Sequence, residues 1–209
     1  MSIENKFKFS IFKWNKMKKI IFVTKNKGKF LSAKIQLEKF GIELVQKILD
    51  FDEPRTNDLY EITKKKALEA SKIFNKPLIV VDAGFFIHSL NGFPGTYVNF
   101  ILETIGIEGI LKLVEGKERK CEFRNVLGYW EPGTKEPILF ESGVFGTISE
   151  KPHGIMKDSY WSPLFLIFIP KGFEKTLSQL NVEKYWKNKT KENSCFIKFG
   201  EWFSERDKI

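Results

Sequence analysis

Short apolar runs alternate with amphipathic stretches along this chain, and they predict alternating strands and helices. Lys19–Val23 (KIIFV) is β-branched and apolar, which is typical of a buried strand. The apolar residues that follow recur at helical spacing and stop at Gly41, which predicts a helix. Its apolar positions are Phe30, Ala33, Leu37 and Phe40.

The next part of the chain repeats this order with a helix over Glu61–Phe74 and a strand over Pro77–Val81. Asp82 is then expected at the carboxyl end of that strand, where open α/β sheets bind ligands. Residues 121–130 and 138–149 flank a Pro-Gly turn and predict a β-hairpin. The other helices are expected over Tyr97–Ile105, Ile107–Val114 and residues 194–206. The pattern predicts an α/β fold with a hairpin-rich second half.

Composition narrows the class of protein. At 209 residues with 42% hydrophobic side chains, the chain has the size and character of one globular domain, and no apolar run is long enough to cross a bilayer. The two cysteines are too few for a disulfide framework, so we expect a reduced, cytoplasmic protein. We assign residues 18–209 to one domain and residues 1–17 to a basic N-terminal extension.

The net charge of +9 raises the question of nucleic-acid binding. Six lysines and a single glutamate lie in the first 19 residues, so more than half of that excess belongs to the extension and its border. An RNA-binding function would rest on this segment alone. We therefore expect no nucleic-acid partner and no membrane partner, and we expect the extension to have no separate function.

The segment after the first strand has the composition of an anion-binding loop. Thr24, Asn26, Gly28 and Lys29 connect a buried strand to the start of a helix, where unpaired backbone N–H groups favour a negative charge. Gly28 allows close approach of the backbone, and Lys29 adds a point charge for phosphate oxygens. The alternative is an ordinary capped turn with solvated lysines, since the segment is not a Walker sequence.

Two acids and one lysine complete the candidate chemistry. Asp82 lies between apolar segments, where a carboxylate needs a cation or hydrogen bonds to offset desolvation. Magnesium (Mg2+) prefers such hard oxygen ligands and binds one or two carboxylates together with phosphate oxygens, so Glu53 is a second candidate ligand. Lys66 lies in a run of three lysines, of which at most two face one site. A turn aspartate, a surface glutamate and a solvated lysine remain the alternatives.

Several of these segments together resemble the inosine triphosphate pyrophosphatase family from about residue 18 to 203. The loop from Thr24 to Lys29 resembles the family's T-G-N-x-x-K. The segment VVDAGFF around Asp82 resembles V-E-D-S-G-F-F, with Asp82 at the catalytic acid. The most specific match is Leu90–Tyr97 (LNGFPGTY), which contains the family's L-x-G-x-P-G-x-Y turn.

The resemblance implies a two-lobed fold with an elongated mixed central sheet, a nucleoside triphosphate in the cleft, and a homodimer. It implies that Glu53 and Asp82 bind magnesium and that Asp82 also activates or orients the attacking water. Lys66 would be catalytic, and Lys29 would stabilise phosphate charge together with Thr24 and Asn26. The products would be a nucleoside monophosphate and pyrophosphate, which is a reaction that removes non-standard purine nucleotides.

The chain departs from the family pattern at the end that recognises the base. Trp161-Ser162 occupies the place of a Trp-Asp pair, and Ser194-Cys195-Phe196 occupies the place of S-H-R. Trp161, Ser162 and Ser194 are the remaining candidate substrate-binding residues. The family's nearby lysine corresponds to Lys184, Lys187 or Lys189. These changes leave two alternatives to an active enzyme of this specificity, namely altered base preference and a weak or inactive nucleotide-binding relative.

Overall fold

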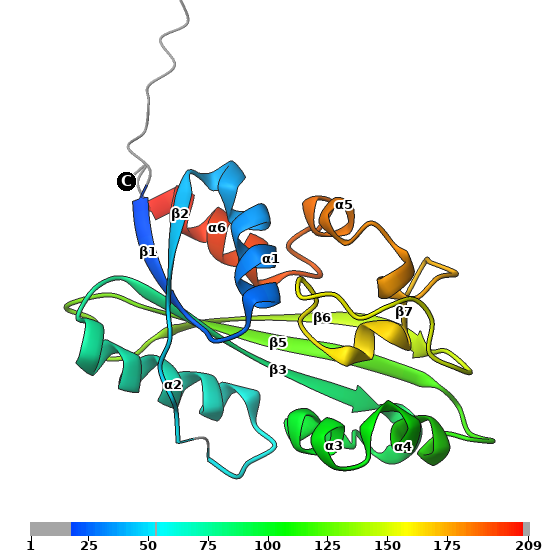
Figure 1. The fold of residues 1–209 in the computed structure, drawn as a ribbon. Helices are drawn as coiled ribbons and strands as arrows, with labels where there is room; N and C mark the ends of the chain where they lie inside the picture. The colour runs from blue at the N-terminus through cyan, green and yellow to red at the C-terminus, as the bar shows by residue number, and fades with distance from the viewer. Residues whose placement is uncertain (1–17, 53, 207–209) are drawn as a thin grey trace, which may run out of the picture.

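The computed structural model describes residues 18–52 and 54–206 of the chain. The expectations for the N-terminal extension, residues 1–17, and for Glu53 therefore lie outside the described residues. Figure 1 shows a long twisted sheet with helices on both sides, which confirms the α/β class. In the part that is described, no helix is long and apolar enough to span a membrane.

The sheet is mixed and has the strand order β2-β1-β3-β5-β6-β7, with β4 paired to β3. The pairs β1–β2 and β1–β3 are parallel, whereas every pair from β3 to β7 and the β3–β4 pair is antiparallel. The expected hairpin is present as β5 and β6. The strands are β1 (Lys18–Val23), β2 (Ile42–Lys47), β3 (Leu78–Ile87), β4 (Pro94–Gly95), β5 (Lys120–Trp130), β6 (Ile138–Ile148) and β7 (Phe168–Pro170).

The longer helices begin and end close to the positions that the sequence predicts. Asn26 caps the start of α1 by accepting a hydrogen bond from the backbone N–H of Lys29, and Gly41 ends the following 3-10 turn in the left-handed conformation. Asp58 caps α2 in the same manner. The helices are α1 (Lys27–Leu37), α2 (Leu59–Phe74), α3 (Val98–Thr104), α4 (Gly106–Leu113), α5 (Val182–Lys187) and α6 (Cys195–Arg206).

Four strands differ from the expectation. The short strands β4 and β7 were not predicted, and neither was β2, whose IELVQK mixes polar and apolar residues, although it pairs with β1 along its whole length. The sequence analysis also ended the strand before Asp82, whereas β3 runs from Leu78 to Ile87 and places Asp82 in its interior. The reason is that β3 pairs with β5 through every one of its residues, so the ladder carries the strand past the aspartate.

The buried side chains form separate cores at the two ends of the long sheet. One core joins α3 and α4 to the distal parts of β3 and β5 and to the segment around Leu164 and Trp186. Near the other end, α1 and α6 pack on one side of β1, β3 and β5, and α2 packs on the opposite side (Figure 1). The fold therefore has two lobes joined by β3, β5 and β6.

Candidate active site

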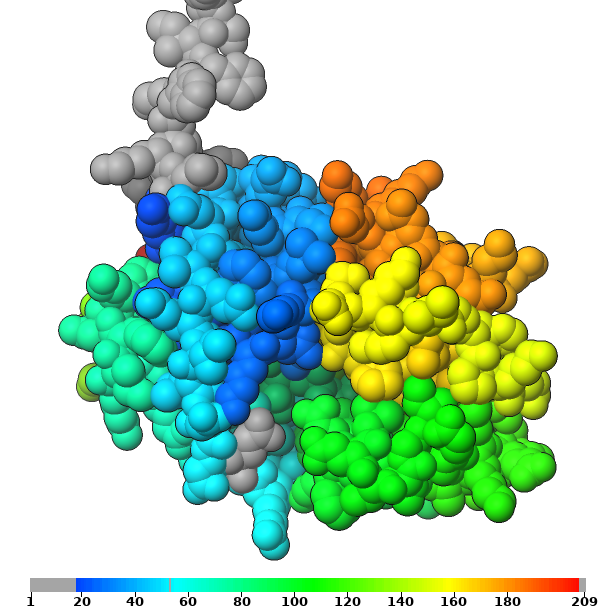
Figure 2. Space-filling view, in the orientation of Figure 1, coloured from blue at the N-terminus to red at the C-terminus, as the bar shows by residue number. Residues whose placement is uncertain are grey.

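A polar cleft of about 280 Å³ lies where the two lobes meet. The loop after β1 forms one wall, and the segment around residues 157–162 lies beside it, as the adjoining blue and yellow surfaces in Figure 2 show. The cleft is lined by most of the candidate residues, namely Thr24, Asn26, Lys29, Lys66, Asp82, Trp161 and Ser162.

The loop after β1 is held in shape by its own side chains. The Thr24 hydroxyl accepts a hydrogen bond from the Asn26 backbone N–H at 3.1 Å, and Asn26 donates from its amide nitrogen to the Trp161 carbonyl at 2.8 Å. A Cβ on Gly28 would come within 2.6 Å of the Ser159 carbonyl oxygen, so only glycine permits this contact. Thr24 and Asn26 therefore shape the loop and join it to the opposite wall.

Lys29 is positioned between the loop and the central strand. It lies in the first turn of α1, and its Nζ is 3.5 Å from the carbonyl oxygen of Val81, the residue before Asp82. A cation at the start of α1 adds to the positive end of the helix dipole. The combination favours a multiply charged anion in this part of the cleft.

Asp82 and Lys66 form an ion pair at the floor of the cleft. Lys66 Nζ is 2.8 Å from Asp82 Oδ1, and the two side chains are only 9% and 13% exposed. Lys66 reaches Asp82 from α2, since it lies on the buried face of that helix, whereas Lys64 and Lys65 are paired with acids on more exposed positions. The structure thus brings together the predicted acid and the predicted lysine, and it selects Lys66 from its run.

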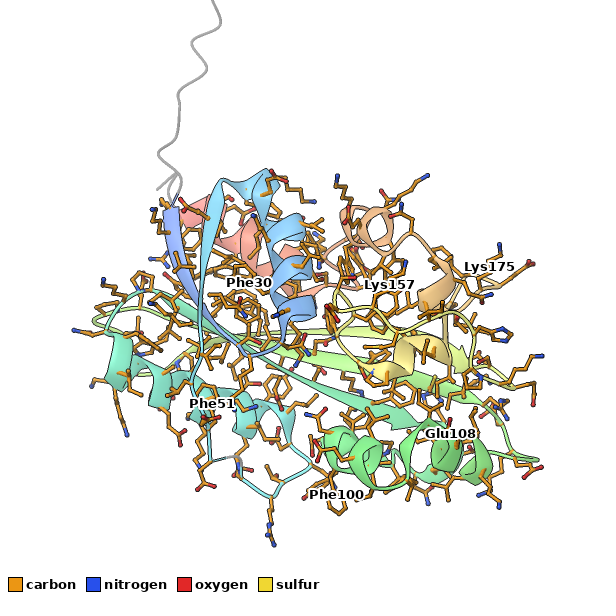
Figure 3. The ribbon with its side chains drawn as sticks, viewed as in Figure 1. Phe30, Phe51, Phe100, Glu108, Lys157 and Lys175 are labelled. Carbon is orange, nitrogen blue, oxygen red and sulfur yellow. The ribbon has the colours of Figure 1, made fainter. Side chains whose placement is uncertain are left out.

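The segment between β2 and α2 closes the lower side of the cleft. Phe51, labelled in Figure 3, lies with its ring centroid 5.7 Å from Lys66 Nζ. Asp50 also lines the cleft and forms an ion pair with Lys25 across its mouth. The part of the loop that precedes Glu53, from Leu49 to Phe51, therefore borders the cleft.

Trp161 and Ser162 have different surroundings from each other. The Ser162 hydroxyl accepts a hydrogen bond from the Leu164 backbone N–H at 3.3 Å and caps a 3-10 helix over Pro163–Leu166. The Trp161 ring lies between the cleft and a second, smaller cavity, because it lines both. Phe123 of β5 lines both spaces as well, and the sequence analysis did not single it out.

Ser194 lies in the second cavity and not in the polar cleft. Its hydroxyl donates to Gln36 Oε1 at 2.5 Å, which joins the start of α6 to α1. Cys195 and Phe196 line the same cavity and are buried, and the Phe196 ring packs edge-on against Phe22. The side chains that replace the family's histidine and arginine are therefore partly core residues.

The choice among the three lysines is clear from their burial. Lys184 and Lys187 are exposed on α5, whereas Lys189 is buried and lines the second cavity. Lys189 Nζ donates to the Asn193 carbonyl at 3.3 Å and lies 4.5 Å from the centre of the Tyr185 ring. Burial lowers the pKa of Lys189 to about 7, against a smaller opposing effect from Cys195. Of the three, Lys189 is the lysine that lines the second cavity.

A phosphate-type loop, a shielded carboxylate–lysine pair and a deep cleft between two lobes thus meet at one place. They define the class of the protein as an α/β protein built to bind a multiply charged anionic ligand. Comparison with known proteins then gives the family. The model of the Ham1 family matches residues 20–194, and the chain belongs to this family.

Individual relatives agree with this assignment. The chain is 42% identical to the dITP/XTP pyrophosphatase of Methanopyrus kandleri over 188 residues, covering 88% of this chain and 96% of that protein. It is 33% identical to the dITP/XTP pyrophosphatase of Thermococcus kodakarensis, covering 90% and 98%. A solved HAM1 protein from Coxiella burnetii matches the fold with a TM-score of 0.74 at 19% identity, covering 90% of this chain and all of that one. The resemblance drawn from the motifs is confirmed.

Proposed function

We propose that this protein hydrolyses non-standard purine nucleoside triphosphates, such as dITP and XTP, to the nucleoside monophosphate and pyrophosphate. The observation that carries the proposal is the Asp82–Lys66 pair at the floor of a cleft whose wall is the loop Thr24–Lys29. The names of the relatives support the same activity. They also favour an active enzyme over an inactive nucleotide-binding relative.

In the proposed reaction, the oxygen of a water molecule attacks the α-phosphorus. The bond from that phosphorus to the bridging oxygen breaks, and pyrophosphate leaves. Asp82 orients the water and accepts its proton, while Lys66 holds Asp82 Oδ1 at 2.8 Å and fixes the direction of the carboxylate. Lys29 and the N–H groups at the start of α1 stabilise the charge on the phosphate oxygens.

Magnesium fits this arrangement. No cluster of three or more His, Cys, Asp or Glu side chains occurs among the described residues, so the protein alone provides no closed metal cage there. Magnesium bound with a triphosphate needs only one or two carboxylates, and we propose Asp82 and Glu53 for these. When bound, the ion would polarise the phosphate oxygens and neutralise part of their charge.

We also propose that the protein is a homodimer and acts in the cytoplasm. Three aromatic side chains, Phe93, Tyr97 and Phe100, are 40 to 62% exposed within eight residues of one another. Figure 3 shows Phe100 at the outer side of α3. A second copy would cover this apolar surface. Sedimentation of the protein with Phe100→Glu tests this, since a dimer that uses this surface should dissociate.

The test of the activity is pyrophosphate release from ITP, dITP, XTP and the four ordinary ribonucleoside triphosphates, with and without magnesium. We expect turnover of the non-standard purines that requires magnesium. Lys29→Met should raise KM strongly because it removes a phosphate-facing charge. Lys27→Met is the matched control, since Lys27 lies two residues earlier in the same helix, is exposed and does not line the cleft. Equal effects of the two substitutions would contradict the proposed site.

A further inference from the structure

The second cavity lies directly behind the cleft, on the far side of Trp161 and Phe123. It is enclosed mainly by aromatic and aliphatic side chains, and six polar or charged side chains interrupt this lining. They come from α1, β5, β6 and the segment between α5 and α6. These residues are Gln36, Asn125, Ser142, Lys189, Asn193 and Ser194.

Five of these six side chains already have partners. Ser194 donates to Gln36, whose amide nitrogen donates to Ser32, and Ser142 accepts from the Cys195 backbone N–H at 2.9 Å. Lys189 donates to the Asn193 carbonyl, and the Asn193 side-chain oxygen accepts from the Thr190 backbone N–H at 3.0 Å. These groups form a satisfied polar border around the cavity.

Asn125 is the exception among these six, and the indole N–H of Trp161, which lines the same cavity, is likewise buried without a partner. Asn125 is 4% exposed, and its Oδ1 is fully buried with no hydrogen-bond partner. An unpaired buried acceptor costs about 1–3 kcal/mol, and native structures contain few of them. An amide in this position is therefore expected to serve a ligand that supplies the missing donor.

The place of Asn125 in the sheet puts it behind the cleft, in the cavity that shares Trp161 and Phe123 with the cleft. In the ladder it lies opposite Ala83 of β3, the residue after Asp82, and opposite Ser142 of β6. Its side chain shares a face of β5 with Phe123 and Leu127, and these two residues belong to the cores of different lobes. Asn125 thus stands at the junction of the lobes, with its side chain on the face of the sheet that α1 and α6 cover, whereas Asp82 meets Lys66 on the face that α2 covers.

The size of the cavity limits what enters it. Its volume of about 40 Å³ is close to the roughly 30 Å³ that one water molecule occupies in the liquid, so a whole purine does not fit. The polar edge of a base that lies against Trp161 and Phe123 would reach the cavity. A ligand edge there meets an acceptor, Asn125 Oδ1, and a donor, Lys189 Nζ.

We propose that Asn125 is a specificity-determining residue that accepts a hydrogen bond from the ring N–H at position 1 of a 6-oxopurine, while Lys189 donates to the adjacent carbonyl oxygen. This inference rests on the proposed function and names how its substrate class is recognised. Hypoxanthine and xanthine both present an N–H beside a carbonyl. Adenine presents the reverse order, an acceptor beside an amine, and would leave the Lys189 donor facing an amine. Guanine has the same edge as hypoxanthine, so this pair selects against adenine.

Binding of three non-hydrolysable α,β-imido triphosphates tests the inference by calorimetry. The bases are hypoxanthine, N1-methylhypoxanthine and adenine. We expect the wild-type protein to bind the inosine analogue at least about tenfold more tightly than either of the others, as for loss of a buried hydrogen bond. In Asn125→Leu, the inosine and N1-methyl analogues should bind within about twofold of each other.

The variant separates hydrogen bonding from steric exclusion. Leucine is close to asparagine in shape, so a methyl group that clashes with the wild-type cavity would still clash in Asn125→Leu. Val144→Ala is the control, since it enlarges the same cavity without changing a polar group. It should change both affinities and keep their ratio. A tenfold ratio that persists in Asn125→Leu would overturn the inference.

Two further results keep the test decisive. Asn125→Asp retains an acceptor and should retain discrimination against the N1-methyl analogue, and its loss would overturn the inference. Asn125→Leu should melt no lower than wild type, because it removes an unpaired buried acceptor.

If the wild-type protein released no pyrophosphate but showed the expected binding ratios, the proposed reaction would be wrong and base recognition by Asn125 would stand. Normal turnover with equal binding of the inosine and N1-methyl analogues would support the reaction and overturn base recognition by Asn125, and no binding of any analogue would reject both.

Discussion

The polar cleft and the second cavity behind Trp161 are lined by different kinds of side chains. The polar cleft of about 280 Å³ contains charged side chains from a loop, a helix start, the middle of α2 and the interior of β3, and its Asp82–Lys66 pair remains 9 to 13% exposed. The cavity behind Trp161 is about 40 Å³, is lined mainly by core aromatics and has only a few polar groups. The first part suits a ligand that is highly charged and hydrated. The second suits the flat edge of a base.

This difference has consequences for how each end responds to change. In the proposed reaction, a charge in the cleft acts on phosphate oxygens at several positions and so affects whether the reaction proceeds. In the proposed base recognition, a polar group in the cavity has one partner and so affects which base is accepted. Substitutions at the phosphate end are therefore expected to alter rate, and those at the base end to alter selectivity and stability.

Asp82→Asn tests the phosphate end most severely. The two side chains have nearly the same shape, but the amide cannot accept the proton of water and does not pair with Lys66. We expect kcat to fall by about 10² or more while the thermal midpoint stays within a few degrees of wild type. Pyrophosphate release and circular dichroism measure the two quantities. Activity close to wild type would mean that another group orients the water.

Lys189 tests the base end through the pH dependence of stability. Because burial lowers its pKa to about 7, the unfolded chain binds a proton that the folded protein does not bind between about pH 7 and 10.5. Stability should therefore rise with pH across this window, with a slope of at most about 1.4 kcal/mol per unit. Below pH 7 both states bind the proton, so the penalty is fully present there.

Urea unfolding of wild type and Lys189→Met at pH 7 and pH 9 isolates this effect. Methionine has no proton to bind. The unfolding free energy of wild type should therefore rise relative to that of Lys189→Met when the pH is raised from 7 to 9. Parallel behaviour of the two proteins would show that Lys189 keeps its charge in the folded state.

Glu53→Gln tests the proposed metal site. We expect the magnesium concentration for half-maximal activity to rise about tenfold, since one of two proposed carboxylate ligands loses its charge. Asp52→Asn is the matched control, because the Asp52 side chain is fully exposed one residue away and does not line the cleft. A magnesium titration that is identical for wild type and Glu53→Gln would remove Glu53 from the site.

Ser162→Ala is expected to have the smallest effect. It removes the hydroxyl that caps the 3-10 helix over Pro163–Leu166, and loss of such a cap costs about 1 kcal/mol in longer helices. The unfolding free energy should fall by about that amount or less, while the preference for hypoxanthine over adenine stays unchanged. A change in base preference would show that Ser162 contacts the base directly.

The sequence by itself determined the loop and helix start that form one wall of the cleft, and the outline of the fold. Local signals specify these features: a strand, a loop with Gly28 and a helix start lie within one continuous segment, and the helix and hairpin patterns need only neighbouring residues. Strand β2 and the true length of β3 were not accessible in this way, since their pairing partners lie far away in the chain. The hydrogen bonds between β3 and β5 continue past Asp82, so β3 stays extended where the local sequence predicts that it ends.

Only the tertiary structure decided the base end. Lys189 and Asn125 are 64 positions apart in the chain, and the exposed Lys184 and Lys187 have the same chemistry as Lys189 until burial distinguishes them. Asn125 is polar among the alternate positions Cys121, Phe123, Leu127 and Tyr129, which was a visible signal, but its significance depends on an oxygen that no other group in the described structure satisfies. Burial and hydrogen-bond satisfaction depend on every element that packs around a group, and a linear pattern does not contain that information.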